Sequence, residues 1–222
     1  MSLRGISEVW REELRRGFLR LAAGEEDAAA EHFARAYACA PGRPEVCFAL
    51  GRERLRRGDR GGATGLLRDA WRADPGLVAA AAALARCLGA LGGGYDVLDE
   101  AQRRSPSEPG LWVVRAELLL GERRIDEARA ALDRASVRAT GRATHAAIAA
   151  CRARAFHIEA ENLADGGRIE EALFAYKRAA DLDPSWSAPH QGMGEMFSRL
   201  GRTARARACF DRARVLQGPI RG

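Results

Sequence analysis

The sequence lacks the features that mark several classes of protein. Its 222 residues include a single lysine, only 6% aromatic residues and five scattered cysteines that form no CxxC pair. An odd number of unclustered cysteines argues against a disulfide framework or a zinc site. No stretch reaches the roughly 18 uncharged apolar residues of a membrane span, and the N-terminus has no apolar core of a signal peptide. We therefore expect a cytoplasmic protein that does not insert into membranes.

Catalytic motifs are also lacking. The chain has no GxxxxGK(S/T) phosphate loop, no GxSxG nucleophile turn and no HExxH pair. His157 and Glu161, followed by Asp165, have the spacing of half a metal site on one helix face. A surface ion pair or a lining of the groove is the simpler interpretation, because no HExxH motif or matching cysteine spacing supports a metal. We predict no catalytic residues, no metal and no cofactor, and an enzyme ranks last among the functions considered.

What the sequence does contain is a repeat of 34 residues. Each copy combines small, large and small side chains at helical spacing, and several copies end at a proline. The clearest are Ala29, Phe33, Ala36 and Pro41, then Ala63, Leu67, Ala70 and Pro75, then Ala172, Tyr176 and Ala179, and finally Ala206, Phe210 and Ala213. A fixed period near 34 predicts helix–turn–helix repeats. One amphipathic helix cannot bury its apolar face alone, so each helix needs a partner from the repeats.

This pattern resembles that of the tetratricopeptide repeat (TPR) family, of a bacterial type, over nearly the whole chain. The resemblance implies an all-α, right-handed α-solenoid of about six TPR-like helix-turn-helix repeats, with about 12 helices. The repeats are expected at residues 6–41, 42–75, 76–106, 107–140, 150–184 and 185–218, and an insertion at 137–150 runs into the fifth. Residues 1–222 would thus form a single solenoid in which each repeat contacts its neighbours.

Two segments depart from the regular period. In the third repeat the first helix, expected near 77–91, is almost all alanine, and Gly92–Gly94 precede the second helix. Three consecutive glycines predict either a strained or flexible joint or a change in the curvature of the solenoid. In the fifth repeat the insertion is expected to lengthen the first helix, which would begin near Ala143.

The C-terminal end lacks the helix that usually covers the last TPR repeat. Val215, Leu216 and Ile220 would then form an apolar end, unless the nearby arginines make it polar enough. Terminal repeats need a polar outer face to stay soluble. Self-assembly into a homo-oligomer through this repeat is therefore an alternative function.

In the TPR family the first helix of each repeat lines a groove that holds a peptide or a partner helix. The resemblance assigns Arg11, Arg15, Phe18, Arg52, Arg56, Arg86, Glu117, His157, Glu161, Asp165, Gln191, Glu195 and Arg199 to this groove. These residues are basic toward the N-terminus and mainly acidic toward the C-terminus, a field that would orient a charged ligand. The lysine and asparagine clamp of chaperone-associated TPR proteins is absent, which disfavours a co-chaperone role.

The sequence therefore predicts a non-catalytic scaffold or adaptor that binds another protein. Arginine side chains favour carboxylates, so an acidic peptide segment is the expected ligand of the N-terminal half. The net charge of +6 and a pI of about 9.5 also raise the question of nucleic acid. Nucleic acid is disfavoured because acids are interspersed with the arginines and the assigned groove lacks aromatic side chains between its basic residues.

Overall fold

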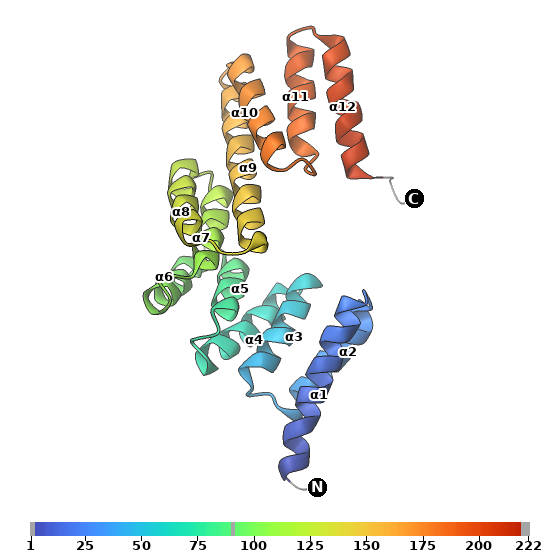
Figure 1. Cartoon of the computed structure of the whole chain (residues 1–222), viewed down its shortest axis with the longest axis vertical. Coiled ribbons are helices and arrows are strands. Elements are labelled where there is room, and N and C mark those ends of the chain that lie inside the picture. The colour runs from blue at the N-terminus through green and yellow to red at the C-terminus, as the bar shows by residue number, and fades with distance from the viewer. Residues whose placement is uncertain (1–2, 90–91, 219–222) are drawn as a thin grey trace. The chain divides into compact units, whose positions relative to one another are not determined.

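The computed structural model describes residues 3–89 and 92–218, and every regular element in these ranges is an α-helix (Figure 1). The helices are α1 (Leu3–Ala22), α2 (Glu26–Cys39), α3 (Pro44–Arg56), α4 (Arg60–Ala73), α5 (Val78–Leu88), α6 (Gly94–Arg104), α7 (Pro109–Gly121), α8 (Ile125–Arg138), α9 (Arg142–Asp165), α10 (Ile169–Leu182), α11 (Ala188–Arg199) and α12 (Thr203–Gln217). The predicted class, an all-α solenoid of TPR-like helix pairs, is confirmed.

The chain divides into two compact units, Met1–Leu111 and Trp112–Gly222. In the first unit α1 to α6 each pack on the next helix, and α3 also contacts α1 and α5. In the second unit α8 to α12 do the same, and α9 also contacts α11. Contact between successive first helices, as well as within a pair, is what stacked helix–turn–helix repeats require.

Small residues let the two helices of a pair approach closely. Gly194 in α11 lies against the ring of Phe210 in α12, where a Cβ at residue 194 would stand 2.6 Å from Phe210 Cε1. Gly51 in α3 lies in the same way against Leu67 in α4. The repeated small and large positions in the sequence are therefore packing partners, and alanine fills much of the remaining core.

The turns inside the repeats share one backbone geometry. Gly24, Gly58, Gly167 and Gly201 each follow a first helix with a positive φ, which glycine adopts without steric cost. Arg123 occupies the equivalent position after α7 with φ 60°, and it is the one non-glycine residue with positive φ among those described. The same hydrogen bond closes the turn at both kinds of residue, from Arg124 N to Leu119 O and from Arg168 N to Leu163 O.

The third repeat differs from its prediction at the end of its first helix. We expected a helix to residue 91, but α5 ends at Leu88, because Gly89 adopts φ 63° and leaves the helical region. Helix α6 then begins at Gly94, where a Cβ would stand 2.5 Å from Gly89 O. A glycine is required there because α6 starts against the end of α5.

The lengthened helix of the fifth repeat is confirmed. Helix α9 has 24 residues and begins after Gly141. At the C-terminal end Val215 is exposed and Leu216 is half-buried, while Ile220 lies outside the described residues. Within the described ranges no helix is both long and apolar enough to cross a membrane.

Candidate functional site

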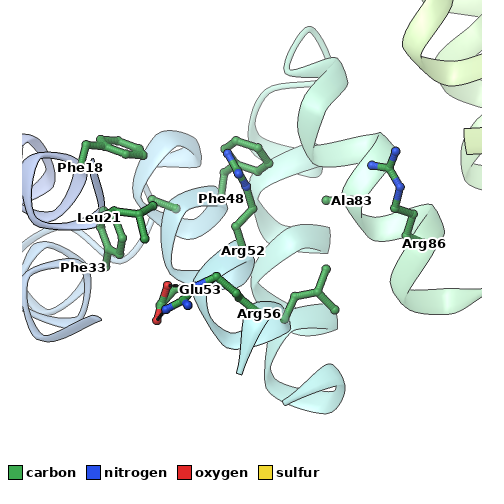
Figure 2. A pocket seen from close by; sticks show the side chains of 11 residues that line it. Phe18, Leu21, Phe33, Phe48, Arg52, Glu53, Arg56, Ala83 and Arg86 are labelled. Carbon is green, nitrogen blue, oxygen red and sulfur yellow. Dashed lines mark hydrogen bonds and ion pairs between the residues drawn. The ribbon is translucent and has the colours of Figure 1, made fainter. Parts of the chain in front are cut away.

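A cavity of about 260 Å³ opens on the first helices of the first unit. It is lined by Phe18, Leu21, Phe33, Phe48, Ala49, Arg52, Glu53, Leu55, Arg56, Ala83 and Arg86 (Figure 2). All of these except Phe33 lie on α1, α3 and α5. Phe18, Arg52 and Arg86 stand at the same position of three successive repeats, so the 34-residue period itself brings them to one cavity.

The floor of the cavity is aromatic. Phe18 packs edge-on against Phe33, with ring centroids 5.2 Å apart, yet 45% of Phe18 remains exposed. Phe33 is buried, so its ring is a fixed support for Phe18. Phe48 lies on the next first helix and is half-buried. A ligand in this cavity would therefore contact the rings of Phe18 and Phe48, and Phe18 is held in place by the buried Phe33.

Arg52 supplies positive charge next to these rings. Its guanidinium lies 5.6 Å from the centre of the Phe48 ring, and Figure 2 shows the two side chains next to each other. The side chain is exposed and makes no ion pair with any residue in the described ranges. Arg86, one repeat further on, is also exposed and lines the same cavity. A ligand carboxylate would find a charge-assisted donor beside an apolar surface.

Arg56 is held differently, because it is neutralised within the protein. Glu53, which is 3% exposed, accepts hydrogen bonds from Arg56 Nε at 3.1 Å and Nη2 at 2.8 Å, and from Arg57 Nε at 2.8 Å. Burial alone would raise the pKa of Glu53, but the two arginines outweigh it and lower the pKa below its ordinary value. Arg56 also pairs with Glu26. These ion pairs fix one edge of the cavity and neutralise the charge of Arg56.

Two of the predicted groove residues lie outside the cavity. The Arg11 guanidinium lies 5.2 Å from the centre of the Trp10 ring. Arg15 is held by Glu12 through bonds of 2.9 and 2.8 Å. The cavity thus brings together Phe18, Arg52, Arg56 and Arg86 of the residues predicted from the N-terminal half, and leaves out Arg11 and Arg15.

In the second unit the predicted residues gather around Tyr176. Burial first, and then the carboxylates of Glu161, Glu195 and Asp165, raise the pKa of Tyr176 to about 12, while Arg199 acts in the opposite direction. Arg199 also donates to Ala164 O at 3.2 Å. Two predicted residues remain. Gln191 is exposed, and its Nε2 lies 3.5 Å from Glu195 Oε1. Glu117 is half-buried on α7.

His157 is half-buried against aromatic rings. Its ring lies 4.7 Å from that of Trp186 and 5.2 Å from that of Tyr176, measured between centroids. His157 Nε2 is 3.4 Å from Glu161 Oε1, while Nδ1 is buried without a hydrogen-bond partner. Burial lowers the pKa of His157, and Glu161 opposes this shift. Because burial favours the neutral imidazole, the pair is a polar contact beside two aromatic rings rather than a surface ion pair.

Several site residues escaped the sequence prediction. Phe48, Glu53 and Leu21 line the cavity, although the groove assignment named none of them. Phe48 was detectable, because it lies one helical turn before Arg52 on the same face. Arg123 was not detectable. It donates to Glu161 Oε2 at 3.1 Å and to Asn162 Oδ1 at 2.6 Å from a turn in which the other repeats carry glycine.

The described residues hold no group of three or more histidine, cysteine or acidic side chains placed to bind a metal ion. Their cysteines are free thiols, of which Cys47 and Cys151 are buried and Cys39 is exposed. Burial raises the pKa of Cys47. Cys47 and Cys151 therefore contribute to packing.

No protein-family model and no curated protein sequence matches the chain. Among solved structures, a chain of the APC/C hetero-tetramer Cut9–Hcn1 is similar over 98% of this chain and 44% of its own length, with a TM-score of 0.68 and 11% identity. TTC0263, a thermophilic TPR protein of Thermus thermophilus, is similar over 93% of this chain and 99% of its own length, with a TM-score of 0.56 and 24% identity.

Human IFIT1, solved as a dimer with m7Gppp-AAAA, is similar over 92% of this chain and 50% of its own length, with a TM-score of 0.67 and 16% identity. The present chain therefore spans half or less of the Cut9–Hcn1 and IFIT1 chains that it resembles. At these identities the similarity concerns the fold alone. The fold is TPR-like.

Proposed function

We propose that this chain is a non-catalytic scaffold whose first unit binds an acidic segment of a partner protein on α1, α3 and α5. The observation that carries the proposal is the position of Arg52, an exposed cation without an acidic partner in the described chain, beside Phe48 in a cavity that Arg86 also lines. A guanidinium next to an apolar wall binds a carboxylate more strongly than one in open solvent, because the local dielectric is lower.

The size of the cavity favours part of a protein chain over a free small molecule. Its volume of about 260 Å³ lies below the roughly 300 to 1,000 Å³ typical of small-molecule pockets. Such a space suits one large side chain of an extended segment, with the neighbouring carboxylates on Arg52 and Arg86. TPR-fold proteins similar to this chain are generally protein-interaction scaffolds, which is consistent with this use of the cavity.

The distribution of charge favours a carboxylate ligand over a nucleic-acid backbone. Glu53 and Glu26 already neutralise Arg56 at the edge of the cavity, so the site does not present the continuous basic track that a phosphate backbone needs. The scarcity of aromatic residues does not itself exclude nucleic acid here, because Phe18 and Phe48 lie among the arginines. Single-stranded oligonucleotides therefore belong among the tested ligands.

The test compares capture of partners from native cells by the wild type and by two variants. Arg52→Glu combined with Arg86→Glu reverses the charge of the cavity, whereas Arg15→Glu reverses an exposed arginine of α1 outside it. We expect the double variant to lose acidic partners that the control variant retains. Retention of every partner by the double variant would contradict the proposal, as would binding of oligonucleotides in place of proteins.

A further inference from the structure

Helix α10 carries an exposed aromatic residue that its repeat position does not explain. Phe174 is 63% exposed. The equivalent position in the other five second helices is also exposed, and it is occupied by Glu31, Gly65, Asp96, Ala130 and Ala208. Five repeats therefore place a small or acidic residue where the fifth repeat places phenylalanine. A single exposed apolar residue is not unusual in itself, but an apolar residue that adjoins further apolar side chains marks an interaction surface.

Phe174 stands in the middle of a stripe with opposite charges at its two ends. Glu170 precedes it by four residues and Arg178 follows it by four, so the three exposed side chains lie on one face of α10. Glu171 adds acid at the first end and Lys177 adds base at the second. The helix macrodipole accounts for this order of charges, but it does not account for the phenylalanine between them.

A partly apolar recess adjoins the stripe. A cavity of about 570 Å³ lies beside Phe174, and its lining combines the apolar Phe156, Leu163 and Ala175 with the charged Arg129, Glu159, Glu170 and Glu171. The Arg178 guanidinium lies 4.9 Å from the centre of the Phe156 ring and 5.8 Å from that of Phe174. The stripe therefore offers both a protruding ring and a space that accepts one.

We propose that this stripe binds a second copy of the chain through antiparallel α10 helices related by a two-fold axis. In that arrangement Glu170 of each copy faces Arg178 of the other, and the two Phe174 rings meet near the axis beside the recesses. A two-fold interface uses the same patch twice and must complement itself. The order acid, phenylalanine, base satisfies this requirement only when the two helices are antiparallel.

The C-terminal helix, at first the expected site of self-assembly, is less suited to it. Val215 is 70% exposed on α12. The same helix carries Arg205, Arg207, Arg212 and Arg214 against a single acid, Asp211. Two copies that met through α12 would bring like charges together, whereas the charges of the α10 stripe attract. The proposal is independent of the acidic-segment site, which lies in the other unit.

The test measures the dissociation constant of the dimer by sedimentation equilibrium of the full chain. Phe174→Ala is expected to weaken the dimer at least about tenfold, as loss of a central aromatic residue does. Because Phe174 is exposed, this variant should retain the helical content of the wild type. Val215→Ala is the matched control, and it should leave the dissociation constant unchanged.

Reversing the charges at the two ends of the stripe tests the antiparallel arrangement directly. Glu170→Arg and Arg178→Glu should each abolish the homodimer, because each leaves like charges opposed across the axis. An equimolar mixture of these two variants should form a heterodimer, because Arg faces Glu at both ends. A wild type that stays monomeric at all concentrations would overturn the proposal. An unchanged dissociation constant in Phe174→Ala, or loss of the dimer in Val215→Ala, would overturn it too.

Discussion

Gly17 lies directly against the ring of Phe33, and a Cβ at residue 17 would stand 2.5 Å from Phe33 Cε1. Phe33 is buried and supports Phe18 at the floor of the cavity. The contact therefore sets both the distance between α1 and α2 and the shape of the candidate site. A small residue recurs in the first helices because a large side chain of the paired second helix packs against it, as Gly51 and Leu67 also show.

Gly17→Ala should accordingly destabilise the protein, by about 1–3 kcal/mol, because the added methyl group overpacks a core with no room for it. Gly65→Ala is the matched control, since residue 65 is exposed on α4 and a Cβ there meets no atom within 4 Å. That change should stabilise the protein by about 0.5–1 kcal/mol, through lower backbone entropy in the unfolded chain. Denaturant unfolding measures both, and equal effects of the same sign would contradict the packing described.

Glu53→Gln should destabilise the first unit by about 1–3 kcal/mol, because Arg56 and Arg57 lose a buried, charged acceptor. Glu12→Gln should cost much less, since Glu12 and its partners Arg15 and Arg16 are solvent-exposed. Chemical denaturation at neutral pH compares the two variants. A larger loss in Glu12→Gln would refute the structural role assigned to Glu53.

The same carboxylate should contribute to acid sensitivity. Its pKa in the folded protein is lowered from the ordinary value of 4.5, so the folded state favours the ionised form. The stability that Glu53 supplies is complete above pH 4.5 and is lost as the pH falls from there through the lower folded pKa. The unfolding free energy of Glu53→Gln should therefore depend less steeply on pH below 4.5 than that of the wild type.

Arg123→Gly should be more stable than Arg123→Ala by about 1 kcal/mol. Both variants lose the contacts of Arg123 with Glu161 and Asn162. Only glycine adopts the positive φ of this turn without strain. The comparison isolates the backbone from the side chain, and thermal unfolding of the two variants measures it. Alanine equal to glycine would mean that the turn at residue 123 is not left-handed.

His157 should make stability fall at mildly acidic pH. Burial lowers the pKa of His157 below its ordinary value of 6.5, against the opposing effect of Glu161, so the folded state favours neutral imidazole. The unfolded chain then takes up the proton first, and stability declines as the pH falls through 6.5 toward the folded pKa. Arg123 and Glu195 are the other charged groups that act on the ring.

His157→Phe keeps an aromatic ring between Tyr176 and Trp186 but cannot be protonated. Its unfolding free energy should fall less than that of the wild type between pH 7.5 and pH 5.5. A residual slope is expected from His190, whose pKa burial also lowers. Identical pH profiles for the variant and the wild type would show that His157 is not buried as described.

The helices could be predicted from the sequence because the same pattern of small and large residues recurs in several repeats. The repeated small, large and small residues predicted the second helices, and the structure shows their large residues Leu67 and Phe210 against Gly51 and Gly194 of the first helices. The end of α5 was misplaced by three residues, because a run of alanines has no polar face to mark where the helix stops. The left-handed turn at Arg123 left no signal, since arginine rarely adopts it.

The candidate site was predictable only where it follows the repeat. Phe18, Arg52 and Arg86 share one repeat position and meet at one cavity. Arg15 lies outside this cavity and is paired with Glu12, three residues away. The aromatic contacts of His157 depend on rings from two other segments, Tyr176 and Trp186. No spacing within one helix could have indicated that arrangement.

The most direct test of the central claim is site-specific photo-crosslinking in native cells. A photoreactive phenylalanine analogue at residue 18 probes the cavity on the first helices, and the same analogue at residue 31 probes the exposed face of the second helix α2. We predict crosslinks to acidic segments of partner proteins from residue 18 and none from residue 31. Crosslinks from residue 31 with none from residue 18 would contradict binding on α1, α3 and α5.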